Sequence, residues 1–594
     1  MYYIFPFHLV KPNEKILIYG AGKAGKNYLN QIRCIEYCTV LCMVDKNFRS
    51  IHIDGIKVIP PEEIKNYEYD WIMVSLLDDN IKAVIGKELS TQYGVPEEKI
   101  IKFHARKLQW DAPIKYYESQ QEEYLETRHL NDYLKEMDAG CLVTRRRIDL
   151  GVRYLLFRDF VNHVENKKHV SLFSRYTLAR NGGIERCSYH SGAGKESVTD
   201  FIEQGKILCE RMEKDGFAQE HFIPLGYESR PYDGLHRIAA ALATHEKVWV
   251  HEYNDRPISE VTLEWFQENG FTVDDQIRIL RAYTDTYAGK CGIFLLYAPT
   301  EDLWGYMEKQ IGNYFAVVGK IDYDFSTNYI AFENVMRQVY SDWDQYSEWL
   351  TRKMDILASS PLKYRIILVS DEDKNNEKFY ENIKALKMDL RSHLFMDVDH
   401  RIPVIVHASD TEGEYLHLRN LFLSANNITW LNKNMRQYYR GWFLNQIKAA
   451  KTWCSDNNIP VENICVVGSA VMELFGIRDA NNFNIIVNHV LFEKCTPLPE
   501  AIEGISFDYC RDENGKAVEN RIIIEDDNYH TVFADLKFCN LDFVYRYKKA
   551  RQMDKDKLDV AKMRSWFEFS TNYENKNELQ KQIKRELYKR GIEI

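Results

Sequence analysis

A turn followed at once by a helix, near the middle of the chain, carries residue types that could bind phosphate. Asp233-Gly234 is a turn pair, and glycine can take the positive φ that such a turn often needs. An apolar helical pattern begins at Ile238 and places His236 and Arg237 in the first turn of a helix. Free backbone N–H groups at a helix start attract anions, and these two side chains add donors and charge. The sequence therefore predicts a phosphate site here.

The D-G-x-H-R-x-x-A-A pattern of this stretch resembles the box of the ParB/sulfiredoxin superfamily, which includes nucleotide-binding partition proteins, sulfiredoxins and free-serine kinases. The resemblance implies an α+β domain over residues 166–287, with catalytic roles for Asp233, His236 and Arg237 and a nucleotide-binding role for Gly234. A kinase needs a carboxylate that takes the proton from the attacking hydroxyl. Glu185 is one candidate for this base and Asp233 is the other. An ordinary helix start with a structural His–Arg pair is the alternative.

A glycine-rich loop near the N-terminus is a second candidate. A buried-strand pattern from Ile16 to Tyr19 runs into G-x-G-x-x-G, formed by Gly20, Gly22 and Gly25, and a helical stretch follows. The next strand ends at Asp45, which is 20 residues past the last glycine. The glycines permit a tight turn and a close approach of backbone to phosphate, and Asp45 could bond a ribose hydroxyl.

This N-terminal segment, residues 12–108, resembles the small Rossmann domains at the front of bacterial polysaccharide-biosynthesis enzymes, including sugar acetyltransferases and epimerase-like proteins. The resemblance implies a Rossmann-like domain over residues 1–108 that binds NAD(P) or a nucleotide-sugar. A Rossmann module kept for assembly is the alternative.

A third candidate lies farther along the chain, where Arg391 precedes His407-Ala408-Ser409-Asp410, with Glu412 and Glu414 after it. Imidazole is a good nucleophile near neutral pH, and a nearby acid can orient its ring. The segments resemble I-R-x-x-F and N-x-x-H-G-S-D of nucleoside-diphosphate kinase. The resemblance implies a ferredoxin-like domain over residues 288–435, in which His407 carries the phosphoryl group and Arg391 binds phosphate. Val404 stands where the family has Asn and Ala298-Pro299-Thr300 replaces its Lys-Pro-Asp, so a degenerate copy is the alternative.

The last segment, residues 436–594, contains a strand, Gly468-Ser469, a helix and Gly476-x-Arg478 before a further strand. This is similar to the nucleotidyltransferase pattern, which implies a nucleotide-binding role for Gly468 and Ser469. The family's D-x-D would hold Mg²⁺ from one side of the strand, but Asn482 and Asn484 occupy those positions. Asn offers a neutral oxygen, so a divalent cation would bind far more weakly. We expect a nucleotidyltransferase-like domain without its chemistry, and no metal site.

Length and composition describe a folded chain of several domains. Its 594 residues suggest about four domains, and 45% apolar residues exclude a disordered protein. The net charge of −10 disfavours nucleic acid as a main partner. No apolar run approaches the roughly 20 residues that span a bilayer, and we expect no membrane insertion and no signal peptide. The 12 scattered cysteines predict buried thiols and a cytoplasmic protein. Residues 109–165 predict a helical connector.

Together these patterns predict an α/β multidomain protein that handles nucleotides. The first hypothesis is a phosphotransferase of cell-surface polysaccharide biosynthesis or modification, which uses ATP, ADP or CTP with Mg²⁺ and a small hydroxylic acceptor. The second is a non-catalytic nucleotide-binding scaffold or regulator of the same pathway, either as a homo-oligomer or in a complex with pathway enzymes. A ParB-like, DNA-associated regulator is the third.

Overall fold

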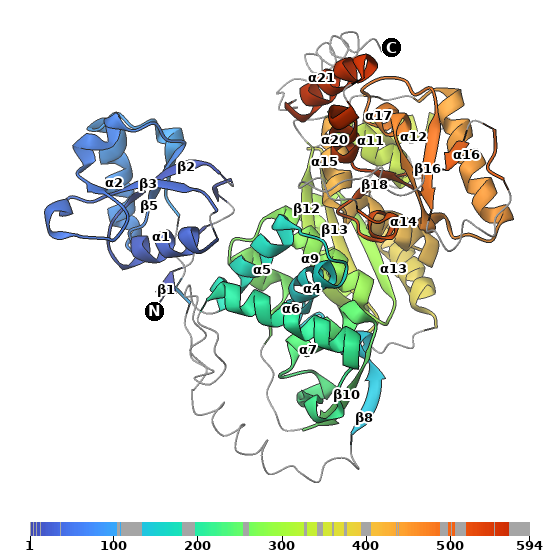
Figure 1. Ribbon diagram of the computed structural model, residues 1–594, viewed down its shortest axis with the longest axis horizontal. Coiled ribbons are helices and arrows are strands. Elements are labelled where there is room, and N and C mark those ends of the chain that lie inside the picture. The colour runs from blue at the N-terminus through green and yellow to red at the C-terminus, as the bar shows by residue number, and fades with distance from the viewer. Residues whose placement is uncertain are drawn as a thin grey trace. The chain divides into compact units, whose positions relative to one another are not determined.

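The computed structural model describes two compact units, Met1–Ala288 and Gly289–Ile594 (Figure 1). Each unit is described by itself. The described residues are 2–568 without the following ranges and single positions: 4, 7–8, 12, 36, 104–106, 109–133, 181–196, 254–259, 326–328, 341–347, 359–360, 373–376, 394–404, 435, 437–438, 488–496, 501, 505–517 and 552.

The first unit opens with a five-stranded sheet in the order β4-β3-β2-β5-β6, in which every pair of neighbours is parallel. The strands are β2 (Lys15–Tyr19), β3 (Thr39–Val44), β4 (Val58–Ile59), β5 (Trp71–Val74) and β6 (Ile100–Ile101). They are continuous apolar runs because helices cover both faces of a parallel sheet. Helix α1 (Lys23–Ile35) packs on one face and α2 (Asp79–Thr91) on the other (Figure 1). This order is Rossmann-like, as the sequence predicts.

Two further short strands, β1 (Tyr2–Tyr3) and β7 (Lys107–Leu108), pair antiparallel. The rest of the first unit is a mixed sheet with helices. Its strand order is β8-β10-β9, with β8 antiparallel and β9 parallel to the central β10. The strands are β8 (Lys135–Asp138), β9 (Ile223–Leu225) and β10 (Lys247–Glu252). The helices are α4 (Leu150–Val161), α5 (Lys167–Arg180), α6 (Val198–Asp215), α7 (Leu235–Thr244), α8 (Leu263–Glu268) and α9 (Val273–Thr286).

The predicted helical connector, 109–165, is described only from residue 134 onward. There it contains helix α4 but also strand β8, which pairs with β10. The sequence pattern did not predict this strand. Lys135–Asp138 is an edge strand whose four side chains are largely exposed and show no apolar alternation. The domain boundaries themselves stay a prediction.

The second unit begins with an antiparallel sheet in the order β12-β13-β11-β14. Its strands are β11 (Cys291–Tyr297), β12 (Ala316–Asp324), β13 (Lys363–Ser370) and β14 (Val406–Ala408). The helices around it are α10 (Trp304–Tyr314), α11 (Tyr329–Val339), α12 (Glu348–Leu357), α13 (Phe379–His393), α14 (Glu412–Phe422) and α15 (Ala425–Lys433). Helices α10 and α13 share one apolar core with the sheet.

A second, mixed sheet completes this unit, in the order β17-β16-β15-β19-β18. Its strands are β15 (Ile464–Val467), β16 (Phe483–Val487), β17 (Ile502–Gly504), β18 (His530–Phe533) and β19 (Leu536–Cys539). The helices are α16 (Gly441–Asp456), α17 (Ser469–Leu474), α19 (Asn520–Glu525), α20 (Leu541–Arg551) and α21 (Asp554–Glu568). The two sheets of the unit are joined through α15, where the Asn427 side chain both donates to the Val532 carbonyl (2.9 Å) and accepts from its N–H (2.8 Å).

The described cysteines agree with the prediction of buried thiols. The eight cysteines whose side chains the structure describes are free, and all of these but Cys141 are buried. Burial raises the pKa of Cys38, Cys42 and Cys209 to about 12, so these thiols stay protonated and unreactive at neutral pH. Among the described helices, none is long and apolar enough to cross a membrane.

Candidate functional site

The three glycines of the N-terminal loop have three different surroundings. Gly20 follows β2 with a φ of +105°, and a Cβ there would lie 2.9 Å from Ser75 Oγ. A Cβ on Gly25 would lie 2.0 Å from the Gly20 carbonyl oxygen, so this glycine lets α1 pack against the loop. At Gly22 a Cβ would meet nothing within 4 Å, and the residue is exposed. The space in front of Gly22 is therefore open to a ligand, at the end of the strand that precedes α1.

Asp45 and Ser75 fix the shape of this loop. Asp45 Oδ2 accepts from the Ala21 N–H (2.8 Å) and Oδ1 accepts from the Asn47 N–H (2.8 Å). Ser75, at the end of β5, donates to the carbonyl of Gly20 (2.8 Å). A carboxylate has about four acceptor positions, so Asp45 keeps capacity for a ribose hydroxyl. Ala21, Gly22 and Asp45 thus lie together at the carboxyl ends of β2 and β3, as the sequence predicts.

The Asp-Gly turn before α7 has the predicted backbone conformation, but Arg237 contacts protein groups. Gly234 has a φ of +83° and is the N-cap residue of α7. Arg237 donates through Nη1 to the carbonyls of His221 (2.6 Å) and Phe222 (2.9 Å), and its Nη2 lies 3.6 Å from Asp233 Oδ2. The guanidinium therefore holds the segment before β9 onto the helix start, which is the structural use of such a pair.

The neighbouring His236 takes part in aromatic packing. Its ring centroid lies 5.9 Å from that of Phe157 on α4 and 6.3 Å from that of Phe173 on α5. His236 and Arg237 thus meet different surroundings, and the structure does not bring them to one shared point. Glu185, the other candidate base, lies outside the described residues.

The third candidate, His407, is buried in β14 with 7% of its surface exposed. Its Nε2 lies 3.2 Å from Glu414 Oε1, and Glu414 Oε2 accepts from the Asp410 N–H (2.6 Å). Burial lowers the pKa of His407 below its ordinary value, because the glutamate offsets only part of the desolvation. Burial acts to raise the pKa of Glu414, but bonds from His407 and the Asp410 N–H hold it below the usual range. The ring is thus neutral near pH 7 and has an acid close to its Nε2, and its role as a phosphoryl carrier stays a prediction.

Arg391 and a lysine that the sequence analysis missed lie in the same region. Arg391 donates through Nε (2.9 Å) and Nη2 (2.7 Å) to the carbonyl of Val406, next to His407. Lys353 on α12 is fully buried, with Nζ 4.6 Å from the ring centroid of Tyr297 and 5.2 Å from that of Tyr340. Burial and, to a smaller extent, Arg391 lower the pKa of Lys353 well below its ordinary value. A lysine on an amphipathic helix gives no sequence signal that distinguishes it from a surface lysine.

The nucleotidyltransferase-like positions lie together at the start of β16. Gly468 has a φ of +77° and precedes α17, and the Ser469 hydroxyl lies 2.9 Å from the Asn482 carbonyl oxygen. Asn484 is buried, and its Oδ1 has no hydrogen-bond partner among the described residues. Glu503 on β17 pairs in register with Asn484. The asparagines stand side by side with the Gly-Ser turn, as predicted, and supply no anionic metal ligand.

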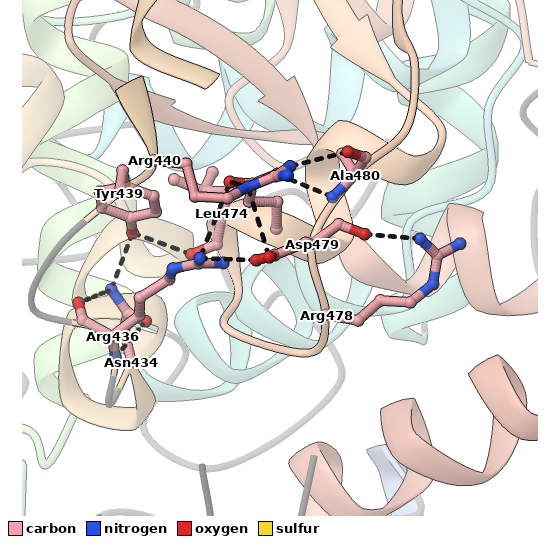
Figure 2. Close-up of polar contacts among 9 residues, drawn as sticks. Asn434, Arg436, Tyr439, Arg440, Leu474, Arg478, Asp479 and Ala480 are labelled. Atoms are coloured by element: carbon pink, nitrogen blue, oxygen red, sulfur yellow. Dashed lines mark hydrogen bonds and ion pairs between the residues drawn. The ribbon is translucent and has the colours of Figure 1, made fainter. Parts of the chain in front are cut away.

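The arginine of Gly-x-Arg is engaged by the C-terminal helix. Arg478 donates to both carboxylate oxygens of Asp559 on α21, through Nε (2.7 Å) and Nη2 (3.0 Å). On the other side of the loop, Arg436 Nη2 donates to Asp479 Oδ1 (2.7 Å), and Arg440 Nη2 donates to the Ala480 carbonyl (2.7 Å) (Figure 2). The loop between α17 and β16 is therefore held from both sides, and its arginine is not directed to a ligand.

The buried carboxylate of Glu473 lies beneath this loop. It accepts from Arg440 Nε (3.0 Å) and Nη2 (2.6 Å) and from the Ala480 N–H (2.7 Å), and Arg436 Nη2 lies 3.8 Å away. A fully buried acid keeps its charge only where donors replace water, and these groups supply them. The sequence analysis did not identify Glu473, because its two arginine partners lie more than 30 residues away in the chain.

Asp535 lies in the turn between β18 and β19, with a φ of +61°. It accepts from His417 Nδ1 (3.0 Å) and from Lys451 Nζ (2.9 Å). The other ring nitrogen of His417 lies 2.7 Å from the Gln338 carbonyl oxygen. Although burial lowers it, bonds to these two acceptors raise the pKa of His417 above its ordinary value. Asp535 is therefore part of a junction between the two sheets of the unit.

Comparison with known protein families gives a match for one domain of the chain. Residues 12–101 match the model of the family described as C2185-like, N-terminal. The matched range covers the parallel sheet and its glycine loop. No curated protein matches the chain. Within the described residues, no group of three or more His, Cys, Asp or Glu side chains could hold a metal ion.

Proposed function

We propose that this protein binds a nucleotide-type ligand, either NAD(P) or a nucleotide-sugar, through the loop Gly20–Gly25. The observation that carries the proposal is the open space at Gly22 between two crowded glycines. A Gly loop that leads into a helix exposes backbone N–H groups to a pyrophosphate, and Asp45 at the end of β3 is positioned for a ribose. Lys23 and Lys26 on the exposed side of the first turns of α1 add positive charge.

The rest of the chain favours a non-catalytic nucleotide-binding scaffold or regulator over a phosphotransferase. At two sites an expected phosphate-binding arginine bonds to the protein itself: Arg237 and Arg391. The asparagines at β16 lack the charge that Mg²⁺ with ATP or CTP needs. The pathway, cell-surface polysaccharide biosynthesis in the cytoplasm, rests on the resemblance of the N-terminal domain alone.

The glycine loop is tested by Gly22→Ala in the full-length protein. We expect the variant to keep its melting temperature, because the added methyl group meets open space, and to lose roughly tenfold or more in affinity for the ligand. Isothermal titration with NAD, NADP and UDP-sugars measures this. Gly305→Ala, also a glycine in open space, is the matched control and should bind as the wild type does. Equal affinity of Gly22→Ala and wild type, or a wild type that binds none of these ligands, would contradict the proposal.

Phosphotransfer through His407 is the second candidate, favoured by the His407–Glu414 contact and by the strand order β12-β13-β11-β14, which supports a ferredoxin-like fold. A neutral imidazole held by an acid can accept a phosphoryl group on its ring nitrogen. We expect incubation with radiolabelled ATP and Mg²⁺ to give an acid-labile phosphoprotein that His407→Ala abolishes and His236→Ala does not. Label that remains in His407→Ala, or no label in the wild type, would rule this candidate out.

A further inference from the structure

The ring of His417 on α14 joins parts of the second unit that lie far apart in the sequence. Its Nδ1 lies 3.0 Å from Asp535 Oδ1, in the turn between β18 and β19. Its Nε2 lies 2.7 Å from the carbonyl oxygen of Gln338 on α11. Helices α11 and α14 belong with the first sheet of the unit, and the turn belongs to the second sheet. One imidazole ring thus connects the two sheets.

The two contacts together require a positively charged ring. A backbone carbonyl oxygen only accepts hydrogen bonds, and so does an ionised carboxylate. A neutral imidazole has one N–H, so it can donate to Asp535 or to Gln338 but not to both. The imidazolium has two N–H groups and satisfies both acceptors at the observed distances. Gln338 also lies in the last turn of α11, where carbonyl groups lack partners within the helix and favour a nearby positive charge.

The turn that His417 contacts has a demanding backbone. Ala534 and Asp535 form a two-residue turn between β18 and β19, with φ values of +48° and +61°. Hairpin turns with two positive φ values favour Asn-Gly or Asp-Gly pairs, and alanine is unusual there. Lys451 on α16 donates to the Ala534 carbonyl (3.2 Å) and to Asp535 Oδ2 (2.9 Å), while His417 contacts the other carboxylate oxygen. Contacts from other elements therefore hold this turn in place.

We infer that His417 is a proton-controlled clamp: as an imidazolium it holds the β18–β19 turn against α11 and α14, and loss of one ring proton releases one of the two contacts. The ring can exchange protons with solvent, because 17% of its side chain and 55% of that of Asp535 are exposed. The charged groups around it are Asp535 from the turn, Lys451 from α16, which shares that carboxylate, and Glu414 three residues earlier on α14. Helix α11 contributes the neutral carbonyl of Gln338. None of these residues lies in the glycine loop, so the clamp stands apart from the proposed nucleotide site.

The clamp should weaken as the pH rises. Burial acts to lower the pKa of His417, but the bonds to Asp535 and to the Gln338 carbonyl raise it above its ordinary value. A group whose pKa is higher in the closed state contributes fully below its open-state pKa of about 6.5, and the contribution is lost as the pH rises through the closed-state pKa. One linked proton changes the opening equilibrium by up to about tenfold per pH unit in that interval. Bonds from His417 and Lys451 hold the pKa of Asp535 well below its ordinary value, so acid does not open the clamp above about pH 4.

Nuclear magnetic resonance of the full-length protein, isotope-labelled at histidine Cε1, measures the protonation of the ring directly. We expect one resonance, absent from the His417→Gln variant, to titrate with a midpoint above about pH 6.5, and Asp535→Asn to lower that midpoint. Asp54→Asn is the matched control, because Asp54 Oδ1 lies 3.2 Å from a ring nitrogen of His52 on the open surface of the first unit. It should leave the His417 midpoint unchanged. A His417 midpoint at or below about pH 6.5, or one that Asp535→Asn does not lower, would overturn the inference.

Hydrogen exchange read by mass spectrometry over β18 and β19 tests whether the proton controls the turn. After correction for the intrinsic effect of pH, protection in the wild type should fall between about pH 6 and about pH 8, by up to about tenfold per unit. In His417→Gln, which cannot titrate, protection should be low at both pH values and should not change between them. His52→Gln, a change on an exposed ring, is the control and should behave as the wild type does.

Equal pH dependence in the wild type and in His417→Gln would overturn the clamp, and so would protection in the wild type that does not change with pH. If His417→Gln does not fold, Asp535→Asn gives the same comparison, because it changes only a half-exposed side chain. Protection in that variant should again be lower than in the wild type at about pH 6.

Discussion

Replacement of Glu473 by glutamine should lower the free energy of unfolding of the second unit by about 3 to 5 kcal/mol. The glutamate is fully buried beneath the loop before β16 and accepts from Arg440, from the Ala480 N–H and, at longer range, from Arg436. Glutamine keeps the volume but removes the charge, so the buried Arg436 loses the negative charge that lies 3.8 Å from its Nη2. Removal of one partner from a buried ionic cluster costs far more than the cluster itself contributes.

Urea unfolding followed by tryptophan fluorescence measures this change, because Trp430 Nε1 donates to the carbonyl of Leu474, the residue after Glu473. Glu503→Gln is the control: it makes the same chemical change on an exposed residue of β17 in the same unit and should cost less than about 0.5 kcal/mol. Equal urea midpoints for the two variants would show that Glu473 is not the centre of this cluster.

An effect of similar size, about 3 to 5 kcal/mol, is expected for Asp149→Asn in the first unit. Asp149 is fully buried at the start of α4 and accepts from Arg147 (3.0 Å twice), Arg153 (2.9 Å) and the Tyr176 hydroxyl (2.6 Å). Asparagine leaves two buried guanidinium groups without a counter-ion. Hydrogen exchange read by mass spectrometry over α4 and α5 should show faster exchange in this variant. The exposed Asp215→Asn is the control and should leave exchange unchanged.

The same carboxylate predicts how the first unit responds to acid. Although burial raises it, Arg147 and Arg153 hold the pKa of Asp149 well below its ordinary value. A group whose pKa is lower in the folded state stabilises the fold above its unfolded pKa of about 3.9 and loses that contribution as the pH falls toward the folded value. The stability difference between wild type and Asp149→Asn should therefore be constant from neutral pH to about pH 5 and shrink below pH 4. A difference that shrinks already near pH 6 would contradict this assignment.

The parts of this protein that the sequence predicts well are those fixed by local geometry. The Gly loop is one, because Gly20 and Gly25 are required by atoms of the adjoining strands and helix, and the asparagines at β16 are another. The use of each arginine could not be predicted. Arg237 and Arg391 bond to carbonyls 15 or 16 residues away, and only the fold decides whether a guanidinium reaches a carbonyl or a ligand.

The burial of two charged side chains could not be predicted from the sequence either. Lys353 and Glu473 look like ordinary surface residues in the sequence, because nothing in their neighbourhood tells how deep they lie. Each is tolerated through partners contributed by other elements: aromatic rings around the lysine and arginines around the glutamate. Strand β8 was missed for a related reason, since an exposed edge strand does not need an apolar pattern. Long-range packing, rather than local propensity, decides these cases.

The ion pair between Arg478 and Asp559 has a consequence for how the protein is made. Its two residues are 81 positions apart in the sequence. The central strand β15 also forms hydrogen bonds with β19, which is synthesised later. A ribosome that adds roughly 5 to 20 residues per second leaves the loop before β16 without its carboxylate for about 4 to 16 s. During that interval Arg478 and the open edge of β15 face the solvent of the cell. The C-terminal sheet and the loop before β16 can therefore be completed only after β19 and α21 have been synthesised.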